Sequence, residues 1–143
     1  MLGGLERLTG AFGQPMDRIL IVDDDESFRS ALRRALSQAG FDVEIAVDGK
    51  DGVRKFRAGN FGLVIVDIFM PEQDGLETLM EIRRNTPGAK VIAISGHGTE
   101  SLEVAKRLGA VGALTKPFQL ADLLSVMRQA LDPGASPGPE KKP

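Results

Sequence analysis

The segment from Val64 to Pro71 constrains the fold of this chain more than any other. Its apolar, mostly β-branched residues surround a single acid, Asp67, and a proline closes the run. A run of this length and composition is typical of a strand buried on both faces, as in the centre of a parallel sheet. Asp67 is then expected at the C-terminal edge of that sheet, where open α/β folds bind their ligands.

Four further segments have the character of short strands, and they alternate with stretches of helical periodicity. The strands are expected at 18–22, 43–46, 90–94 and 110–115. Apolar residues at helical spacing are expected to mark the buried faces of the helices, at 27–39, 53–56, 76–80, 102–108 and 120–131. Five strands that alternate with five helices predict an α/β fold, with a doubly wound five-stranded parallel sheet and right-handed crossovers.

Composition excludes several classes of protein. The 143 residues suggest one domain, and 18 Lys and Arg against 20 Asp and Glu offer no broad basic surface for nucleic acid. The chain has no cysteine, which excludes disulfides, thiol catalysis and cysteine zinc sites. With no apolar run of about 18 residues and no secretion leader, we expect a soluble, cytoplasmic protein that contacts neither DNA nor membranes.

The two ends of the chain differ from the segment between them. Residues 1–15 are glycine-spotted and weakly patterned, which indicates a flexible N-terminal extension, with a docking arm as the less favoured alternative. Residues 132–143 are rich in Pro, Gly, Ser and Lys, as expected of a disordered tail or the start of a linker. The folded domain is therefore expected at 16–131.

Polar residues follow four of the five expected strands. Asp23 and Asp24 follow the first strand, and Asp67, Ser95 and Lys116 end or follow the third, fourth and fifth. Parallel strands bring these residues to one edge, where carboxylates about 4 Å apart repel by roughly 4 kcal/mol at an effective dielectric near 20. A divalent cation relieves that repulsion, and carboxylate and carbonyl oxygens suit Mg²⁺.

Magnesium beside a lysine predicts phosphate chemistry. Mg²⁺ and Lys116 would neutralise charge on a transferring phosphoryl group, and the Ser95 hydroxyl would hydrogen-bond one of its oxygens. Asp67 fits the role of covalent phosphoryl acceptor best, because a carboxylate can form an acyl phosphate. Each residue alone has a plainer explanation, as a solvated acid, a turn residue or a surface charge, but their shared edge favours a common site.

Four motifs at these strand ends resemble the receiver domain of two-component response regulators. The motifs are Val22-Asp23-Asp24, Val66-Asp67 with Met70-Pro71, Ile94-Ser95-Gly96 and Thr115-Lys116-Pro117-Phe118. The resemblance covers residues 16–131 and implies a flavodoxin-like fold with the strand order 2-1-3-4-5. It also implies a signalling switch, not a classical enzyme, that catalyses its own phosphorylation and dephosphorylation. The phosphoryl donor would be the phosphohistidine of a sensor histidine kinase or a phosphotransfer protein.

The resemblance further implies a ligand set and an output. Asp24 would ligate Mg²⁺ directly and Asp23 largely through water, and Asp67 and the backbone carbonyl of Phe69 would complete the protein ligands. Output would pass by protein contact to an unknown downstream partner. We expect a monomer before phosphorylation, with a dimer possible afterwards.

The switch residues follow the family with one departure. Ser95 would supply the switch hydroxyl, Lys116 would pair with the phosphate, and the Lys116-Pro117 bond would be cis. Ala113, however, stands three residues before the lysine, where the family usually has an aromatic whose rotamer couples to the hydroxyl. Coupling is therefore expected through the Ser95 loop to the helix at about 100–108, which together with the fifth strand would form the output face.

Three residues near the site have open roles. His97 either covers the phosphoryl group and tunes its hydrolysis or is an exposed loop histidine. The ring of Phe69 either shields the pocket or rests on it exposed. No role is assigned to Asp25.

Two other functions compete with the switch. Residues 23–27 also match the Asp-x-Asp-x-Ser pattern of haloacid-dehalogenase-type phosphohydrolases, in which Asp23 would be the nucleophile. That family needs a further acidic strand end after Lys116, whereas residues 120–131 have helical periodicity. The other alternative is a pseudo-receiver that binds proteins without phosphorylation, which the complete set of acids and lysine disfavours.

Overall fold

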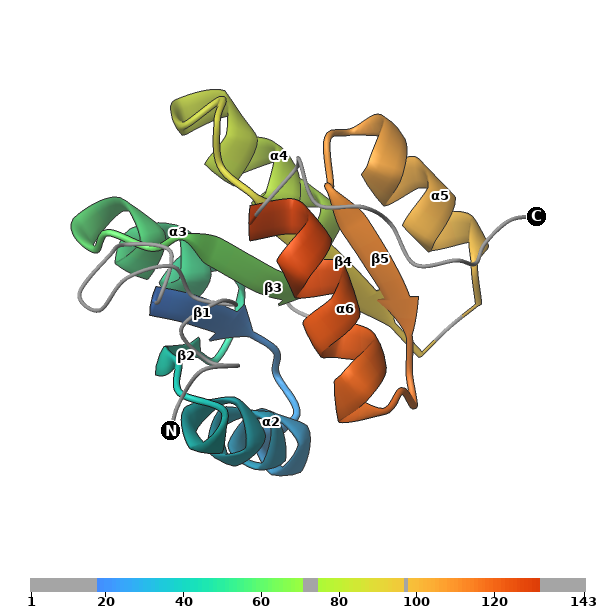
Figure 1. Cartoon of the computed structure of the whole chain (residues 1–143). Coiled ribbons are helices and arrows are strands. Elements are labelled where there is room, and N and C mark those ends of the chain that lie inside the picture. Colours follow the sequence, from blue (N-terminus) through green and yellow to red (C-terminus); the bar gives the residue numbers. More distant parts are fainter. Residues whose placement is uncertain (1–17, 71–74, 97, 132–143) are drawn as a thin grey trace.

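A computed structural model of the chain describes residues 18–70, 75–96 and 98–131. Within these ranges, a five-stranded parallel sheet lies between two layers of helices (Figure 1). The strand order is β2-β1-β3-β4-β5, and each neighbouring pair is parallel. The predicted doubly wound, flavodoxin-like fold and its 2-1-3-4-5 order are confirmed.

The central strands are buried along their whole length. Every residue of β3 and β4 is buried, whereas the edge strands β2 and β5 are only partly covered. Such burial is what parallel strands require when helices cover both faces. The fifth strand is shorter than expected from the sequence. The strands are β1 (Arg18–Val22), β2 (Asp42–Ala46), β3 (Leu63–Asp67), β4 (Val91–Ser95) and β5 (Gly112–Thr115).

Local features place the starts of α2 and α3 and the ends of α2 and α5. The side chains of Asp25 and Asp48 accept backbone N–H groups and so cap the first turns of α2 and α3. Gly40 and Gly109, which follow α2 and α5, have φ angles of 104° and 112° that favour glycine. The helices are α2 (Glu26–Gln38), α3 (Gly49–Ala58), α4 (Gly75–Asn85), α5 (Glu100–Arg107) and α6 (Leu120–Leu131).

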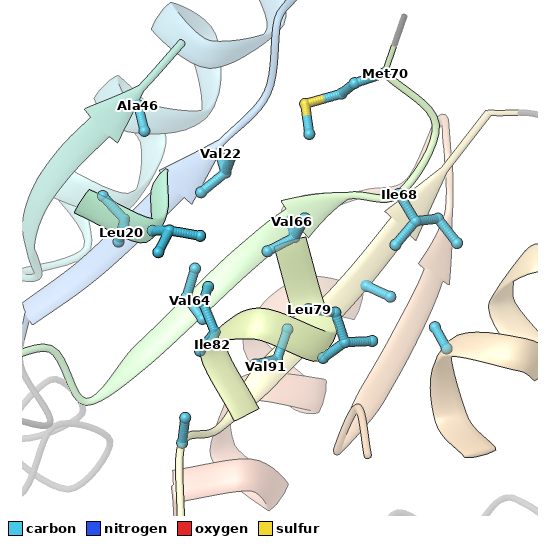
Figure 2. Packing of buried hydrophobic residues seen from close by; sticks show 14 of the residues in the cluster. Leu20, Val22, Ala46, Val64, Val66, Ile68, Met70, Leu79, Ile82 and Val91 are labelled. Atoms are coloured by element: carbon cyan, nitrogen blue, oxygen red, sulfur yellow. The ribbon is translucent and has the colours of Figure 1, made fainter. Parts of the chain in front are cut away.

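Alternate residues of the strands serve two hydrophobic cores. On one face, Val64 and Val66 of β3 pack with Leu79 and Ile82 of α4, in a core that also includes residues of α3 and α5 (Figure 2). On the other face, the intervening strand residues pack against α2 and α6. Because successive side chains of a strand point to opposite faces of the sheet, each strand contributes to both cores. The helices that cover each face are those that pack into the core on that face.

Several expectations lie outside the described residues. They concern the N-terminal extension at 1–15, the tail at 132–143, His97 and the turn that includes Pro71. The helix α6 occupies the position at which the haloacid-dehalogenase alternative needs another strand. None of the helices in the described ranges has the length and apolarity that crossing a membrane requires.

Candidate functional site

Three polar residues are buried at the C-terminal edge of the sheet. Asp23 follows β1, and Asp67 and Ser95 are the last residues of β3 and β4. Asp23 and Ser95 are fully buried, and Asp67 is 6% exposed. Because β1, β3 and β4 are consecutive in the sheet, their ends meet at one place, as the sequence predicted. Buried carboxylates are costly unless they are paired, so their partners decide what the site can do.

Lys116 pairs with both buried acids. Its Nζ lies 3.0 Å from Oδ2 of Asp23 and 3.2 Å from Oδ2 of Asp67. The lysine follows β5, where its backbone N–H donates to the carbonyl of Ser95 at 2.8 Å, and the Lys116-Pro117 bond is cis as expected. One ammonium group therefore bridges two carboxylates that come from different strands.

Backbone groups orient the same two carboxylates. The N–H of Asp25 donates to Oδ1 of Asp23, and the N–H of Phe69 donates to Oδ1 of Asp67, each at 2.9 Å. In each acid, one oxygen thus faces the backbone and the other faces Lys116. This division fixes the carboxylate planes, which is the preorganisation that a reactive or metal-binding acid needs.

A third acid completes a cluster of oxygen donors. Asp23, Asp24 and Asp67 each offer a carboxylate oxygen, and these oxygens lie within 4.8 Å of one another. Asp24 is exposed while the other two are buried, so the cluster opens to solvent on one side. Three carboxylates in a small, solvent-open cluster fit a hard cation such as Mg²⁺ that retains several waters.

The electrostatics of the site are set mainly by burial. Burial raises the pKa of Asp23 and the nearby charge of Asp67 adds to this, although the Asp25 N–H and Lys116 oppose it. Burial by itself would lower the pKa of Lys116, but the hydrogen bonds and charges of Asp23 and Asp67 raise it overall. The lysine is thus held as a cation, while the ionised form of Asp23 is penalised unless further positive charge is supplied.

Two aromatic rings adjoin the lysine. The Nζ of Lys116 lies 4.0 Å from the centroid of the Phe28 ring, and Phe28 meets Phe118 edge-on, with centroids 5.9 Å apart and ring planes at 85°. In the sequence, Phe28 is one of the apolar residues at helical spacing after Ser27, and that spacing gives no sign of this contact. Phe69, two residues after Asp67, is 53% exposed, so its side chain is not buried over the site.

Gly75 is a second residue whose importance the sequence did not reveal. It begins α4, and a Cβ atom there would lie 2.2 Å from the carbonyl oxygen of Asp67 and 2.2 Å from Cα of Ile68. Only glycine therefore allows the start of α4 to approach the end of β3 so closely. Ala113, the departure noted in the sequence, lies in β5 opposite Ala93 of β4 and is partly buried.

Comparison with known proteins agrees with this geometry. Residues 19–128 match the family model of the response regulator receiver domain. Response regulator MprA of Mycolicibacterium vanbaalenii is 37% identical over 115 residues, which are 80% of this chain and 50% of that protein. The DNA-binding transcriptional regulator NtrC of Rhizobium meliloti is 35% identical over 114 residues, which are 79% of this chain and 24% of that protein. The chain thus spans half or less of these curated relatives.

Some solved structures are similar over nearly their whole length. A CheY-like receiver domain protein from Methanospirillum hungatei superposes with a TM-score of 0.77 at 33% identity, covering 81% of this chain and 94% of that one. The response regulator TrrA from Thermotoga maritima, crystallised with Mg²⁺ and BeF, gives a TM-score of 0.74 at 32% identity, covering 80% of this chain and 98% of that one.

Proposed function

Because the chain belongs to the response regulator receiver family, we propose that it is a phosphorylation-dependent switch whose phosphoryl acceptor is Asp67. The observation that carries the proposal is the bridge from Lys116 to Asp67 and Asp23, at 3.2 Å and 3.0 Å. An ammonium held beside the acceptor carboxylate can stabilise the charge on an incoming phosphoryl group without reorganising during the reaction.

The proposed donor is the phosphohistidine of a sensor histidine kinase or phosphotransfer protein. An oxygen of the Asp67 carboxylate attacks phosphorus, the phosphorus–nitrogen bond breaks, and its electron pair returns to the imidazole ring. Lys116 pairs with the transferred group, and the Ser95 hydroxyl donates to one of its oxygens. In a separate step, water attacks phosphorus, the bond between phosphorus and the Asp67 oxygen breaks, and its electron pair returns to the carboxylate as inorganic phosphate leaves. The domain itself would thus catalyse both gain and loss of the group.

The carboxylates of Asp23, Asp24 and Asp67, with the backbone carbonyl of Phe69, are the proposed Mg²⁺ ligands. The fit rests on three oxygen donors within 4.8 Å, one of them exposed to solvent. When bound, the ion would neutralise charge on the phosphoryl oxygens. TrrA was crystallised in complex with Mg²⁺ and BeF. That complex belongs to TrrA, and it motivates a test of whether this chain also binds Mg²⁺.

The proposed output runs from Ser95 to α5 and β5. Ser95 ends β4, and a short loop follows it before α5 begins at Glu100. Ala113 supplies no aromatic rotamer for the switch, so movement of this loop and α5 would carry the signal to a downstream protein. Among the relatives, NtrC is described as DNA-binding, so the lack of direct nucleic-acid contact remains an expectation for this chain. A monomer before phosphorylation also remains an expectation, which sedimentation would check.

Intact-mass spectrometry after incubation with acetyl phosphate tests the proposal. The wild type is expected to gain one phosphoryl group when Mg²⁺ is present and none when it is chelated, and Asp67→Asn is expected to gain none. Asp42→Asn, at an exposed carboxylate that begins β2, is the matched control and should behave as the wild type. Loss of the adduct in Asp23→Asn with retention in Asp67→Asn would favour the hydrolase alternative instead. Absence of any adduct would favour a pseudo-receiver.

A further inference from the structure

We propose that Phe28 is a positioning residue that holds Lys116 in place for the phosphoryl group, an inference that rests on the proposed function. The Nζ atom of Lys116 contacts two carboxylates and one aromatic face, and these three partners come from the loop after β1, the end of β3 and the first turn of α2. A cation within about 6 Å of a ring centroid is attracted by the ring quadrupole, and the distance here is 4.0 Å.

The backbone of Phe28 is tied to the acidic cluster. Its N–H donates to the Asp25 side chain at 3.2 Å, and the N–H of Asp25 donates to Oδ1 of Asp23 at 2.9 Å. The first turn of α2 is thereby connected to the same carboxylate that accepts from Lys116. This chain of contacts also gives Asp25, which had no assigned role, a structural one as the cap of α2.

The ring of Phe28 also contacts a second aromatic ring. Phe118 meets it edge-on at 5.9 Å, in the arrangement that aromatic pairs prefer, and both rings pack against the core beneath α2 and α6. Phe118 is also only two residues beyond Lys116. The Phe28 ring thus contacts both the lysine and a second ring that follows the lysine in the chain.

Such support matters because a lysine side chain is long and flexible. Its four-carbon stem has many rotamers, and each excursion takes the ammonium away from Asp67. The two carboxylates restrain the ammonium by charge and by hydrogen bonds, and the Phe28 ring adds a third contact from a different element. Removing the ring is expected to leave the ion pairs possible but less populated, which weakens binding of a phosphoryl group by reducing preorganisation.

The chain contains a matched control at the opposite end of the sheet. The guanidinium of Arg18, which begins β1, lies 4.5 Å from the centroid of the Phe61 ring, and Phe61 stacks on Phe56 at 6.2 Å. This is again a cation on a ring that is backed by a second ring. Phe61→Leu therefore removes an equivalent contact at a place remote from Asp67.

The test measures the affinity of the full chain for fluoroberyllate in the presence of Mg²⁺, by ¹⁹F NMR. Phe28→Leu is expected to weaken binding roughly five- to tenfold, within the range of a partly buried cation–π contact. Phe28→Tyr, which keeps the ring, should stay within about twofold of the wild type, and so should Phe61→Leu. Thermal unfolding shows whether each variant is folded, and Phe28→Met replaces Phe28→Leu if the latter is not.

A double-mutant cycle separates positioning from general packing. In a Lys116→Met background, Phe28→Leu is expected to cause no further loss of affinity, because the ring then has no cation to hold. Equal affinity of Phe28→Leu and the wild type for fluoroberyllate would overturn the inference. Equal losses of affinity in Phe28→Leu and Phe28→Tyr would also overturn it. So would an undiminished loss of affinity when Phe28→Leu is added to Lys116→Met. Failure of the wild type to bind fluoroberyllate would instead contradict the proposed function, and the inference with it.

Discussion

At the scale of single residues, burial and charge pairing act in opposite directions on the buried carboxylates of the site. Asp23 is fully buried, and its burial raises its pKa in spite of the Lys116 ammonium 3.0 Å away. Asp67 has the same lysine at 3.2 Å and a backbone N–H on its other oxygen. Two carboxylates that share one ammonium leave excess negative charge, so the arrangement favours binding of a cation.

Asp23→Asn tests this balance between burial and charge pairing. An acid with a raised native pKa binds its proton more tightly in the folded state, so stability is lost as pH rises from the unfolded value of 3.8 through the native value. The neutral amide avoids this cost. At neutral pH without divalent ions, the variant is expected to be more stable by about 1 kcal/mol, a Tm increase of roughly 2–6 °C. Scanning calorimetry in a chelator measures it.

Mg²⁺ provides the complementary measurement on the same pair of proteins. Saturating Mg²⁺ should raise the Tm of the wild type, because a ligand that binds only the folded state stabilises it. The increase should be much smaller for Asp23→Asn. A variant that is less stable than the wild type in chelator, or that responds equally to the ion, would contradict the account of the acidic cluster.

At the scale of elements, the starts of α2, α3 and α4 are each placed by a local feature. Asp51 lies in the first turn of α3 and accepts the N–H of Val47 at 3.1 Å, with Lys55 at 3.5 Å and Arg54 also paired to it. Burial alone would raise its pKa, but the Val47 N–H and the two cations lower it overall. The carboxylate thus joins the loop after β2 to the helix.

Asp51→Asn should therefore have a pH-dependent effect. A lowered native pKa contributes stability that is present above the unfolded value of 3.8 and disappears as pH falls through the native value. We expect the variant to be destabilised by about 1 kcal/mol at pH 7, and the difference to vanish in strong acid. Urea titrations across this range would check it, and a difference independent of pH would refute the electrostatic explanation.

The start of α4 is placed by Gly75 against the end of β3. Gly75→Ala would put Cβ 2.2 Å from the Asp67 carbonyl and 2.2 Å from Cα of Ile68, contacts that only backbone movement can relieve. We expect a loss of about 2–4 kcal/mol in the free energy of unfolding. Gly88→Ala, where a Cβ would meet nothing within 4 Å, is the matched control and should change it by less than about 0.5 kcal/mol. Equal urea midpoints for the two variants would contradict this.

At the scale of the whole molecule, the fold could be predicted from two patterns in the sequence, the apolar strand runs and the helical periodicity between them. The apolar run around β3 is typical of a strand buried on both faces of a parallel sheet, and parallel strands bring their C-terminal ends to one edge. Asp23, Asp67 and Lys116 were predicted to meet for that reason, without knowledge of any distance. The strand order came from the resemblance to a family, because periodicity alone does not order strands.

The remaining features of the site depend on contacts between elements. Phe28 lies on an apolar stripe like any core residue, and only tertiary packing shows that its ring faces Lys116. Gly75 looks like part of a turn, and its reason is the approach of another backbone segment. Asp25 belongs to an acidic run whose members the sequence does not distinguish, although one caps α2. Local patterns carry no information on such long-range contacts.

The most direct test of the central claim is to locate the phosphoryl group on the chain. After incubation with acetyl phosphate and Mg²⁺, borohydride reduces an aspartyl phosphate to homoserine, and peptide mass spectrometry identifies the position. The account predicts a single reduced residue at Asp67 that is absent when Mg²⁺ is chelated. Reduction at Asp23 or no reduced residue at all would contradict it, and the switch would have to be abandoned as the function of this site.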